Sequence, residues 1–377
     1  MLKKYFNLFL IPFTIFLLTS CSNKGCDLLI LNWGDYISSD LIDKFEEEYN
    51  VKVKEVTTDS NESFYSKIQN KSASYDLVFP SDYMIDQMAE DGLIYELDFT
   101  KLTNYKSDMF IPELNELINS KNCISYKNYH IPYFWSSLGI MYQTTRYDNL
   151  EEIIKKYSWK VFFEPDLLPE GCRVGMYSSS RDALAAAELY LGYDLNTTNT
   201  VEIDNAMSTL KNATFYEWGT DDLKLDVSSH KLDIALVYSG DYFDAYYSDL
   251  EAEGENSTSS NVDTYSIYAP TDRNNIFFDS MCIPKTSTNI DLAYKFIDFM
   301  IDYENNLENC NFVGYCPTLN AVYETFKTDG EHDDVIAIDA YHPAKIVNGD
   351  GYYCVYSYLG KETYSYIERK FTSVIFR

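Results

Sequence analysis

Basic residues are scarce in this chain. Its 377 residues carry 30 Lys and Arg against 59 Asp and Glu, so the formal net charge at pH 7 is −29. A surface this acidic repels the phosphates of nucleic acids and the headgroups of anionic lipids. We therefore expect no nucleic-acid partner, and a cationic partner is the natural inference.

The sequence also lacks the motifs of common enzyme and metal sites. It has no Gly-x-Ser-x-Gly, His-Glu-x-x-His, Walker, Gly-x-Gly-x-x-Gly or EF-hand pattern. Histidine occurs four times, and only Glu331-His332-Asp333-Asp334 offers a local cluster, which we interpret as a solvated charged loop. We expect no enzymatic activity, no metal and no cofactor. A surface hydrolase that uses two carboxylates stays as an alternative from another class.

Cysteines do not form a recognisable framework. Seven remain after Cys21, an odd number, and no Cys-x-x-Cys is present, so neither a zinc ribbon nor a redox motif is supported. Cys310 and Cys316 are the only near pair. Export would permit a disulfide, but the count does not require one.

The N-terminus is typical of an exported protein. A short basic start precedes an apolar run from Tyr5 to Leu18, which is too short for a comfortable membrane-spanning helix. The following Thr19-Ser20-Cys21 looks like the end of a bacterial lipoprotein signal. We predict a signal peptide over 1–20, lipidation of Cys21 and a tether over 21–26, with the protein held at the outer face of the cytoplasmic membrane. An ordinary signal peptide or an uncleaved anchor is the alternative.

Hydrophobic patterns predict strands that alternate with helices, as in an α/β protein with a mainly parallel sheet. In the first part of the chain we expect strands at 28–31, 51–56 and 76–79, and helices at 39–49 and 60–71. Residues 131–135 start a second region. There we expect helices at 182–191, 202–211 and 290–303, strands at 234–238 and 281–284, and a polar surface loop over 251–263.

Aromatic residues stand beside carboxylates where the predicted strands end. An alkyl ammonium needs both groups, since a ring face covers its methylenes and a carboxylate replaces the water it loses. Core packing is the alternative for any single ring. Ligands of such sheets bind beyond the carboxyl ends of the strands, so we predict a cation site there. The four pairs are Trp33-Gly34-Asp35-Tyr36, Asp82-Tyr83, Tyr238-Ser239-Gly240-Asp241 and Phe277-Phe278-Asp279.

Eight short segments then carry a resemblance over nearly the whole chain beyond the signal peptide. Through these segments, which follow one another in the family's order, the chain resembles the spermidine/putrescine-binding proteins of bacterial polyamine ABC importers. The segments are Asn32-Trp33-Gly34-Asp35-Tyr36-Ile37, Ser60-Asn61-Glu62-Ser63, residues 75–83 from Tyr75 to Tyr83, Ile131-Pro132-Tyr133-Phe134-Trp135, Ser180-Arg181-Asp182, Leu191-Gly192-Tyr193, Phe278-Asp279-Ser280 and Gly314-Tyr315-Cys316-Pro317-Thr318.

The resemblance implies an α/β, two-lobed periplasmic-binding-protein fold with a ligand cleft between the lobes. One lobe would hold residues 27–136 and 279–323, and the other 137–278 and 324–377. The protein would be a monomer that captures putrescine or spermidine and delivers it to the membrane permease of an ABC importer. Another small cation, or an amino-sugar-like solute, is the alternative on the same fold. A lipoprotein that serves only as an adhesin is a further one.

The resemblance also implies site residues, position by position. Ser178 and Ser179 stand where spermidine-type members often carry an acid, which leads us to expect putrescine to bind at least as well as spermidine. Tyr238 and Phe277 replace residues that are often Trp. Asp82 joins the set from the aromatic–acid pairs, and Tyr356 from a looser match. The predicted ligand-binding residues are Trp33, Asp35, Tyr36, Ser81, Asp82, Tyr83, Asp182, Tyr238, Asp241, Phe277, Asp279, Tyr315 and Tyr356.

Overall fold

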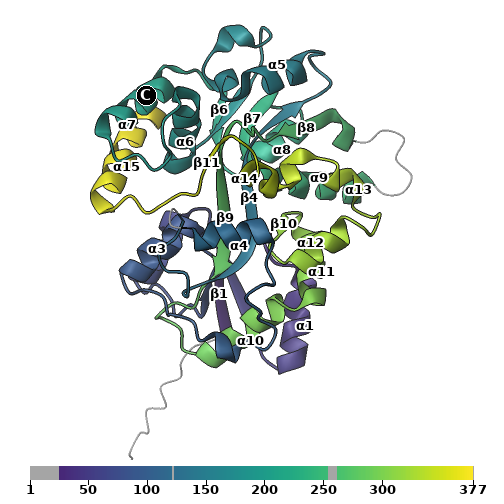
Figure 1. Ribbon diagram of the computed structural model, residues 1–377. Coiled ribbons are helices and arrows are strands. Elements are labelled where there is room, and N and C mark those ends of the chain that lie inside the picture. Colours follow the sequence, from purple (N-terminus) through teal and green to yellow (C-terminus); the bar gives the residue numbers. More distant parts are fainter. Residues whose placement is uncertain (1–24, 121–122, 254–260, 377) are drawn as a thin grey trace, which may run out of the picture.

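A computed structural model describes residues 25–120, 123–253 and 261–376, so Cys21 and the predicted signal peptide lie outside the described residues. Helices and strands gather in two halves, one above the other in Figure 1, with β4 and β9 running through the middle. The strands are β1 (Leu28–Asn32), β2 (Val53–Thr57), β3 (Leu77–Val78), β4 (Ile131–Gln143), β5 (Val174–Tyr177), β6 (Glu217–Gly219), β7 (Ile234–Tyr238), β8 (Tyr265–Tyr268), β9 (Arg273–Met281), β10 (Cys316–Pro317) and β11 (Tyr352–Cys354).

Helices cover these strands, and within the described ranges none is long and apolar enough to cross a membrane. They are α1 (Ser39–Tyr49), α2 (Asn61–Gln69), α3 (Asp82–Glu90), α4 (Pro112–Asn119), α5 (Leu150–Tyr157), α6 (Ser180–Leu191), α7 (Thr200–Asn212), α8 (Asp222–Ser228), α9 (Ser239–Glu253), α10 (Ile290–Met300), α11 (Tyr303–Val313), α12 (Asn320–Phe326), α13 (Asp333–Ile336), α14 (Pro343–Val347) and α15 (Lys361–Ile375). Short 3-10 helices lie at Phe99–Lys101, Ser158–Phe162, Pro165–Leu167, Asn261–Thr264 and Asp339–Tyr341.

Two sheets hold the strands. The first has the order β2-β1-β3 and is parallel throughout, as the sequence predicts for this part of the chain. The second has the order β11-β9-β4-β7-β5-β6, with β8 and β10 also paired to β4. The long strand β4 is antiparallel to β7, β8, β9 and β10, so this sheet is mixed and the prediction of a mainly parallel sheet is wrong here. All thirteen residues of β4 are buried, so β4 is the central strand of this sheet.

Three other predicted segments have different bounds in the structure. The expected strand at 281–284 overlaps β9 only at Met281, and Cys282 and Pro284 form isolated bridges to Val78 and Ile94. The rest of β9 is not predicted because polar residues such as Asn274 and Asn275 are buried inside it. The expected helix 290–303 is two helices, since the Asp302 carboxylate caps a new one by accepting the Glu304 and Asn305 N–H groups. Helix α9 continues into the expected polar loop, of which 254–260 lie outside the described residues.

His332 is not part of a solvated loop. Its side chain is buried, its ring stacks on Phe326 at 3.9 Å between centroids, and its nitrogens lie 2.8 Å from Asp329 Oδ2 and from Asn311 Oδ1. Only the acidic neighbours Glu331, Asp333 and Asp334 are exposed. The histidine therefore packs the start of α13 against α12. Cys310 and Cys316 are buried free thiols.

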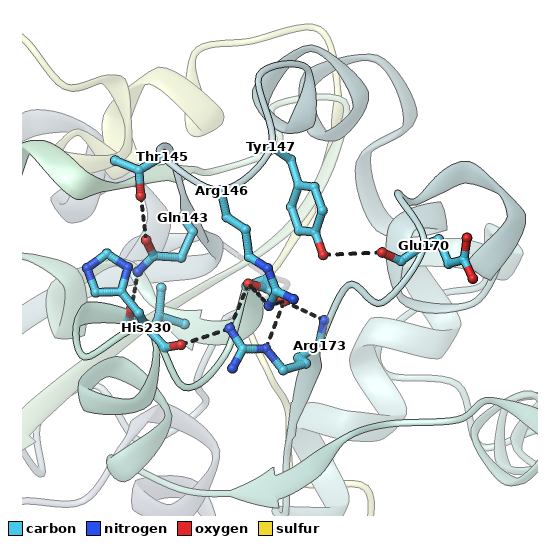
Figure 2. Close-up of polar contacts among 9 residues, drawn as sticks. Gln143, Thr145, Arg146, Tyr147, Glu170, Arg173 and His230 are labelled. Atoms are coloured by element: carbon cyan, nitrogen blue, oxygen red, sulfur yellow. Dashed lines mark hydrogen bonds and ion pairs between the residues drawn. The ribbon is translucent and has the colours of Figure 1, made fainter.

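Asp233 joins three strands in the upper half. Its buried carboxylate receives Arg146 Nη1 at 2.9 and 3.0 Å, Arg173 Nε at 3.0 Å and Arg173 Nη2 at 2.9 Å. Figure 2 shows the two arginine side chains converging from opposite sides. Burial alone would raise the pKa of Asp233, but the hydrogen bonds from Arg173 and Arg146 outweigh it and hold that pKa below its usual value. This cluster ties the loop after β4 to the starts of β5 and β7.

Candidate functional site

A cavity of about 100 Å³ lies where helices of the two halves meet. It is lined by every residue that the sequence predicts for the site except Asp82. Asp82 is buried, and its Oδ1 accepts the N–H of Tyr83 at 2.6 Å, so the side chain folds back on the start of α3 instead of facing the cavity. Burial raises the pKa of Asp82 well above its usual value. The serine before it, at the N-cap position of α3, is the sequence signal that could have indicated a helix start here.

Three of the acids that line the cavity come from the first turns of helices. Glu62 lies in the first turn of α2, Asp182 in that of α6 and Asp241 in that of α9. Ser179 caps α6 by accepting the N–H of Asp182 at 3.3 Å, so its hydroxyl is used at the start of this helix. A carboxylate is favoured at a helix N-terminus by the helix dipole, so the fold stabilises acids where several helices point at one cavity.

Asp279 is a further buried carboxylate of the cavity. It lies inside β9 opposite Phe134, beside a register shift in β4, and it bridges to Ser81 on its other side. Its Oδ1 accepts the Ser81 hydroxyl at 2.6 Å and its Oδ2 accepts the Tyr36 hydroxyl at 2.7 Å. The side chain is 4% exposed, and burial raises its pKa to about 6 although the two hydroxyls oppose the rise.

No Lys or Arg within the described parts of the chain pairs with Asp279. An unpaired buried carboxylate costs several kcal/mol, so the site is poised for a positive charge from outside. The prediction that Phe277 and Asp279 follow a strand is wrong, because β9 continues to Met281. They reach the cavity from within the strand, where β4 is irregular. Such irregularities commonly re-aim side chains beside binding sites.

Asp241 is held by a tyrosine from a distant segment. Its Oδ1 accepts the Tyr315 hydroxyl at 2.7 Å and its Oδ2 accepts the N–H of Tyr238 at 3.2 Å. The Tyr315 ring passes over Gly240, where a Cβ would lie 2.3 Å from the ring. Only glycine fits there, which explains the sequence Ser239-Gly240-Asp241. Burial raises the pKa of Asp241 to about 6 against the lowering effect of Lys224.

Aromatic rings supply the rest of the wall. Trp33 is half-buried, donates from Nε1 to the Phe79 carbonyl at 2.8 Å and meets the Phe64 ring edge to face at 4.8 Å. The centroids of Tyr238 and Phe277 are 4.7 Å apart. Across the cavity, Tyr83 and Tyr356 pack edge to face at 6.1 Å, and the Tyr356 hydroxyl donates to Asp182 at 3.3 Å.

The prediction missed several lining residues. Arg181 is buried, with its guanidinium 4.4 Å from the Tyr356 ring centroid and a hydrogen bond to Asn196 at 2.7 Å. Glu62 accepts hydrogen bonds from Tyr83 and, from α15, Tyr364. Both residues belong to segments that carry the resemblance, so their place in those segments could have indicated that they line the site. The remaining missed residues are Gly34, Asp59, Ser60, Asn61, Tyr177, Ser179, Asp221, Lys224, Asp244 and Val313.

Metal-ligating side chains come together outside the cavity. In the part of the chain that the structure describes, one such group is formed by Glu217, Asp222 and Asp226. The Lys231 ammonium lies 2.7 Å from Glu217 and 2.8 Å from Asp226, so a side chain already supplies positive charge there. None of these residues lines the cavity.

Comparisons with known proteins then decide the family. The family described as bacterial extracellular solute-binding protein matches residues 40–334. The chain belongs to this family. A putrescine-binding periplasmic protein of Pseudomonas aeruginosa is 28% identical over 81% of this chain and 82% of its own. This solute-binding protein is therefore exported and not an enzyme, as the sequence predicts.

Solved structures agree with this assignment. The spermidine/putrescine transporter substrate-binding protein of Streptococcus pneumoniae superposes with a TM-score of 0.69 at 27% identity, over 92% of this solute-binding protein and 98% of that chain. A lipoprotein of Treponema pallidum has the same fold, with a TM-score of 0.73 at 23% identity over 93% and 99% of the two chains. The predicted α/β periplasmic-binding-protein fold is confirmed.

Proposed function

We propose that this solute-binding protein captures a polyamine, putrescine or spermidine, in the cavity and delivers it to the permease of an ABC importer. Its relatives support this choice, since those from Pseudomonas aeruginosa and Streptococcus pneumoniae carry putrescine and spermidine/putrescine in their names. The acidic surface favours the same class, because a net charge of −29 attracts a small cation.

Asp279 is the observation that carries the proposal. A buried carboxylate that two hydroxyls orient, and that no side-chain cation of the described residues neutralises, fits an alkyl ammonium. The ammonium would donate to Asp279 while neighbouring rings cover the methylenes, and the buried charge would gain its partner. A neutral solute would leave the charge unpaired.

The remaining features of the proposal concern location and assembly. We place the protein at the outer face of the cytoplasmic membrane, lipid-anchored through Cys21 after removal of residues 1–20, and as a monomer. Lobe 1 would be residues 27–136 and 279–323, lobe 2 residues 137–278 and 324–377, and the lobes would close on the ligand by a hinge. Changing Cys21 to Ser should prevent lipidation and leave binding by the soluble domain intact. A Ser variant that still carries lipid would contradict the anchor.

Putrescine should bind at least as well as spermidine. Each buried ammonium needs its own acceptor, and the serine that spermidine-type relatives often replace by an acid caps α6 here. Direct competition between the two amines for the purified protein tests this. Spermidine winning by tenfold or more, about 1.4 kcal/mol, would contradict it.

One experiment tests the function itself. Protein purified from its native host is denatured, and the released small molecules are identified by mass spectrometry, with Asp279→Asn purified in parallel as control. We expect an unmodified polyamine from the wild type and at least tenfold less from the variant. Release of a neutral solute, or of a polyamine in equal amounts from both proteins, would contradict the proposal. A chemically converted product would point to the hydrolase alternative.

A further inference from the structure

Lys224 is a cation in the wall of a cavity that is lined mostly by acids and aromatic rings. It lies on α8, which packs against α9 (Figure 1), and its side chain is 16% exposed. Its Nζ is 2.6 Å from Asp244 Oδ2 and 3.9 Å from Asp241 Oδ1. Burial would lower the pKa of this lysine, but Asp241 and Asp244 outweigh it and raise the pKa, so the ammonium stays charged. The sequence gives no hint of this, because Lys224 follows two aspartates and looks like part of a solvated helix face.

Two buried acids of the cavity, Asp279 and Asp241, therefore differ in the positive charge that surrounds them. Asp279 has two hydroxyl donors and no side-chain cation among the described residues. Asp241 has a tyrosine hydroxyl, a backbone N–H and the Lys224 ammonium nearby. A ligand ammonium that approached Asp241 would meet Lys224 as well. Two ammonium groups a few ångströms apart repel each other, and the repulsion is strong away from bulk water.

We propose that Lys224 is a specificity-determining residue whose ammonium stands in for one ligand amine at the Asp241 end of the cavity. The inference rests on the proposed polyamine-binding function and deepens it. With this position filled, the cavity accepts a solute with fewer cationic groups, so a diamine is preferred to a triamine. The preference comes from a like charge placed against the larger ligand, which is selection by repulsion as well as by attraction.

Arg181, the other cavity cation, does not do this. Its guanidinium donates a hydrogen bond to Asn196 and lies over the Tyr356 ring. Among the described residues, Arg181 forms no ion pair with Asp241 or Asp279. Lys231 is a matched control on the same stretch of chain. Its Nζ lies 2.7 Å from Glu217 and 2.8 Å from Asp226, its side chain is 48% exposed, and it does not line the cavity.

The test measures putrescine and spermidine affinities by titration calorimetry for the wild type, Lys224→Met and Lys231→Met. Because Lys224→Met leaves Asp244 without its partner, Lys224→Met/Asp244→Asn is a second variant that removes the unpaired charge. We expect the affinity ratio of spermidine to putrescine to rise at least fivefold in both Lys224 variants and to stay within twofold in Lys231→Met. A rise of less than fivefold in the folded Lys224 variants would overturn the inference.

Two further outcomes separate this inference from the proposed function. The wild type is also titrated with 4-aminobutyrate, which carries a carboxylate where putrescine has an ammonium-bearing methylene. Tighter binding of 4-aminobutyrate than of putrescine would show that Lys224 meets a ligand anion, and would overturn the inference. Binding of neither amine by the wild type would overturn the proposed function and this inference with it, whereas amine binding with an unchanged ratio overturns the inference alone.

Discussion

Asp233 and Asp279 are both buried carboxylates, but their surroundings are opposite. Asp233 receives two arginines, and its pKa lies below the usual value. Asp279 receives only hydroxyls, and burial raises its pKa to about 6. The first acid is satisfied within the chain and holds strands together. The second is not, and an uncompensated charge of this kind is what a binding site for a cation requires.

The largest expected effect comes from removing the unsatisfied acid. Asp279→Ala should weaken putrescine binding about 30-fold or more, because cutting one side of a desolvated charge pair costs roughly 2 to 5 kcal/mol. Titration calorimetry measures this. The isosteric Asp279→Asn is the control, and at pH 7.5 it should be no less stable than the wild type, since it removes a buried charge with a raised pKa. Affinity within threefold of wild type in both variants would remove Asp279 from the site.

The reciprocal change should affect stability and leave binding alone. Asp233→Ala leaves two arginines without their carboxylate, and because both are partly exposed we expect a loss of about 2 kcal/mol in the free energy of unfolding, below the range for a fully buried pair. Urea unfolding and calorimetry check the two effects. A folded Asp233→Ala protein with tenfold weaker putrescine binding would break the contrast between the two acids.

Acid should separate the two carboxylates in the same way. Asp279 has a raised pKa, so it loses its charge as the pH falls through about 6, and putrescine binding should be about tenfold weaker at pH 5.0 than at 7.5. Asp233 has a depressed pKa and stays ionised over this range, so the fold should persist. Calorimetry at both pH values, with circular dichroism as control, tests this. Equal affinity at the two pH values would contradict it.

A smaller effect is expected from the rings. Trp33→Ala should weaken binding by a cation–π contribution of roughly 0.5 to 2 kcal/mol and leave the protein folded. Trp159 is the matched control, since its Nε1 also donates to a backbone carbonyl, at 2.7 Å, but it is buried away from the cavity. Trp159→Phe should lower the melting temperature and spare binding. If Trp33→Ala instead melts far below wild type and binds normally, Trp33 is a core residue.

The sequence predicted elements best where burial is periodic and uninterrupted. The helix at 39–49 and the strand at 234–238 have the predicted bounds, since each places its apolar residues on the core side. Strand β9 was missed because Asn274, Asn275 and Asp279 are buried within it, and local patterns cannot show which distant groups hydrogen-bond to them. Strand β4 was not predicted, for a related reason. Its pairing with four different strands is a property of the whole fold.

The site was predictable where one segment carries both a ring and an acid. The close contact between Gly240 and Tyr315 could not be predicted in this way, since it joins segments far apart in the chain. The proposed role of Lys224 could not be predicted either, because it depends on Asp241 and Asp244 of the neighbouring helix. Asp82 was overpredicted, because an acid beside a tyrosine can also turn back onto its own helix.

Proton release during binding tests most directly whether an ammonium is captured by a carboxylate with a raised pKa. Putrescine is titrated into the wild-type protein at pH 6.0 in two buffers of different ionisation enthalpy, and the difference in heat counts the protons. At pH 6.0 a carboxyl with a pKa of about 6 carries about half a proton. An ammonium beside Asp279 lowers that pKa, so binding should release up to about half a proton per site. Binding with no proton release, or with proton uptake, would contradict the account.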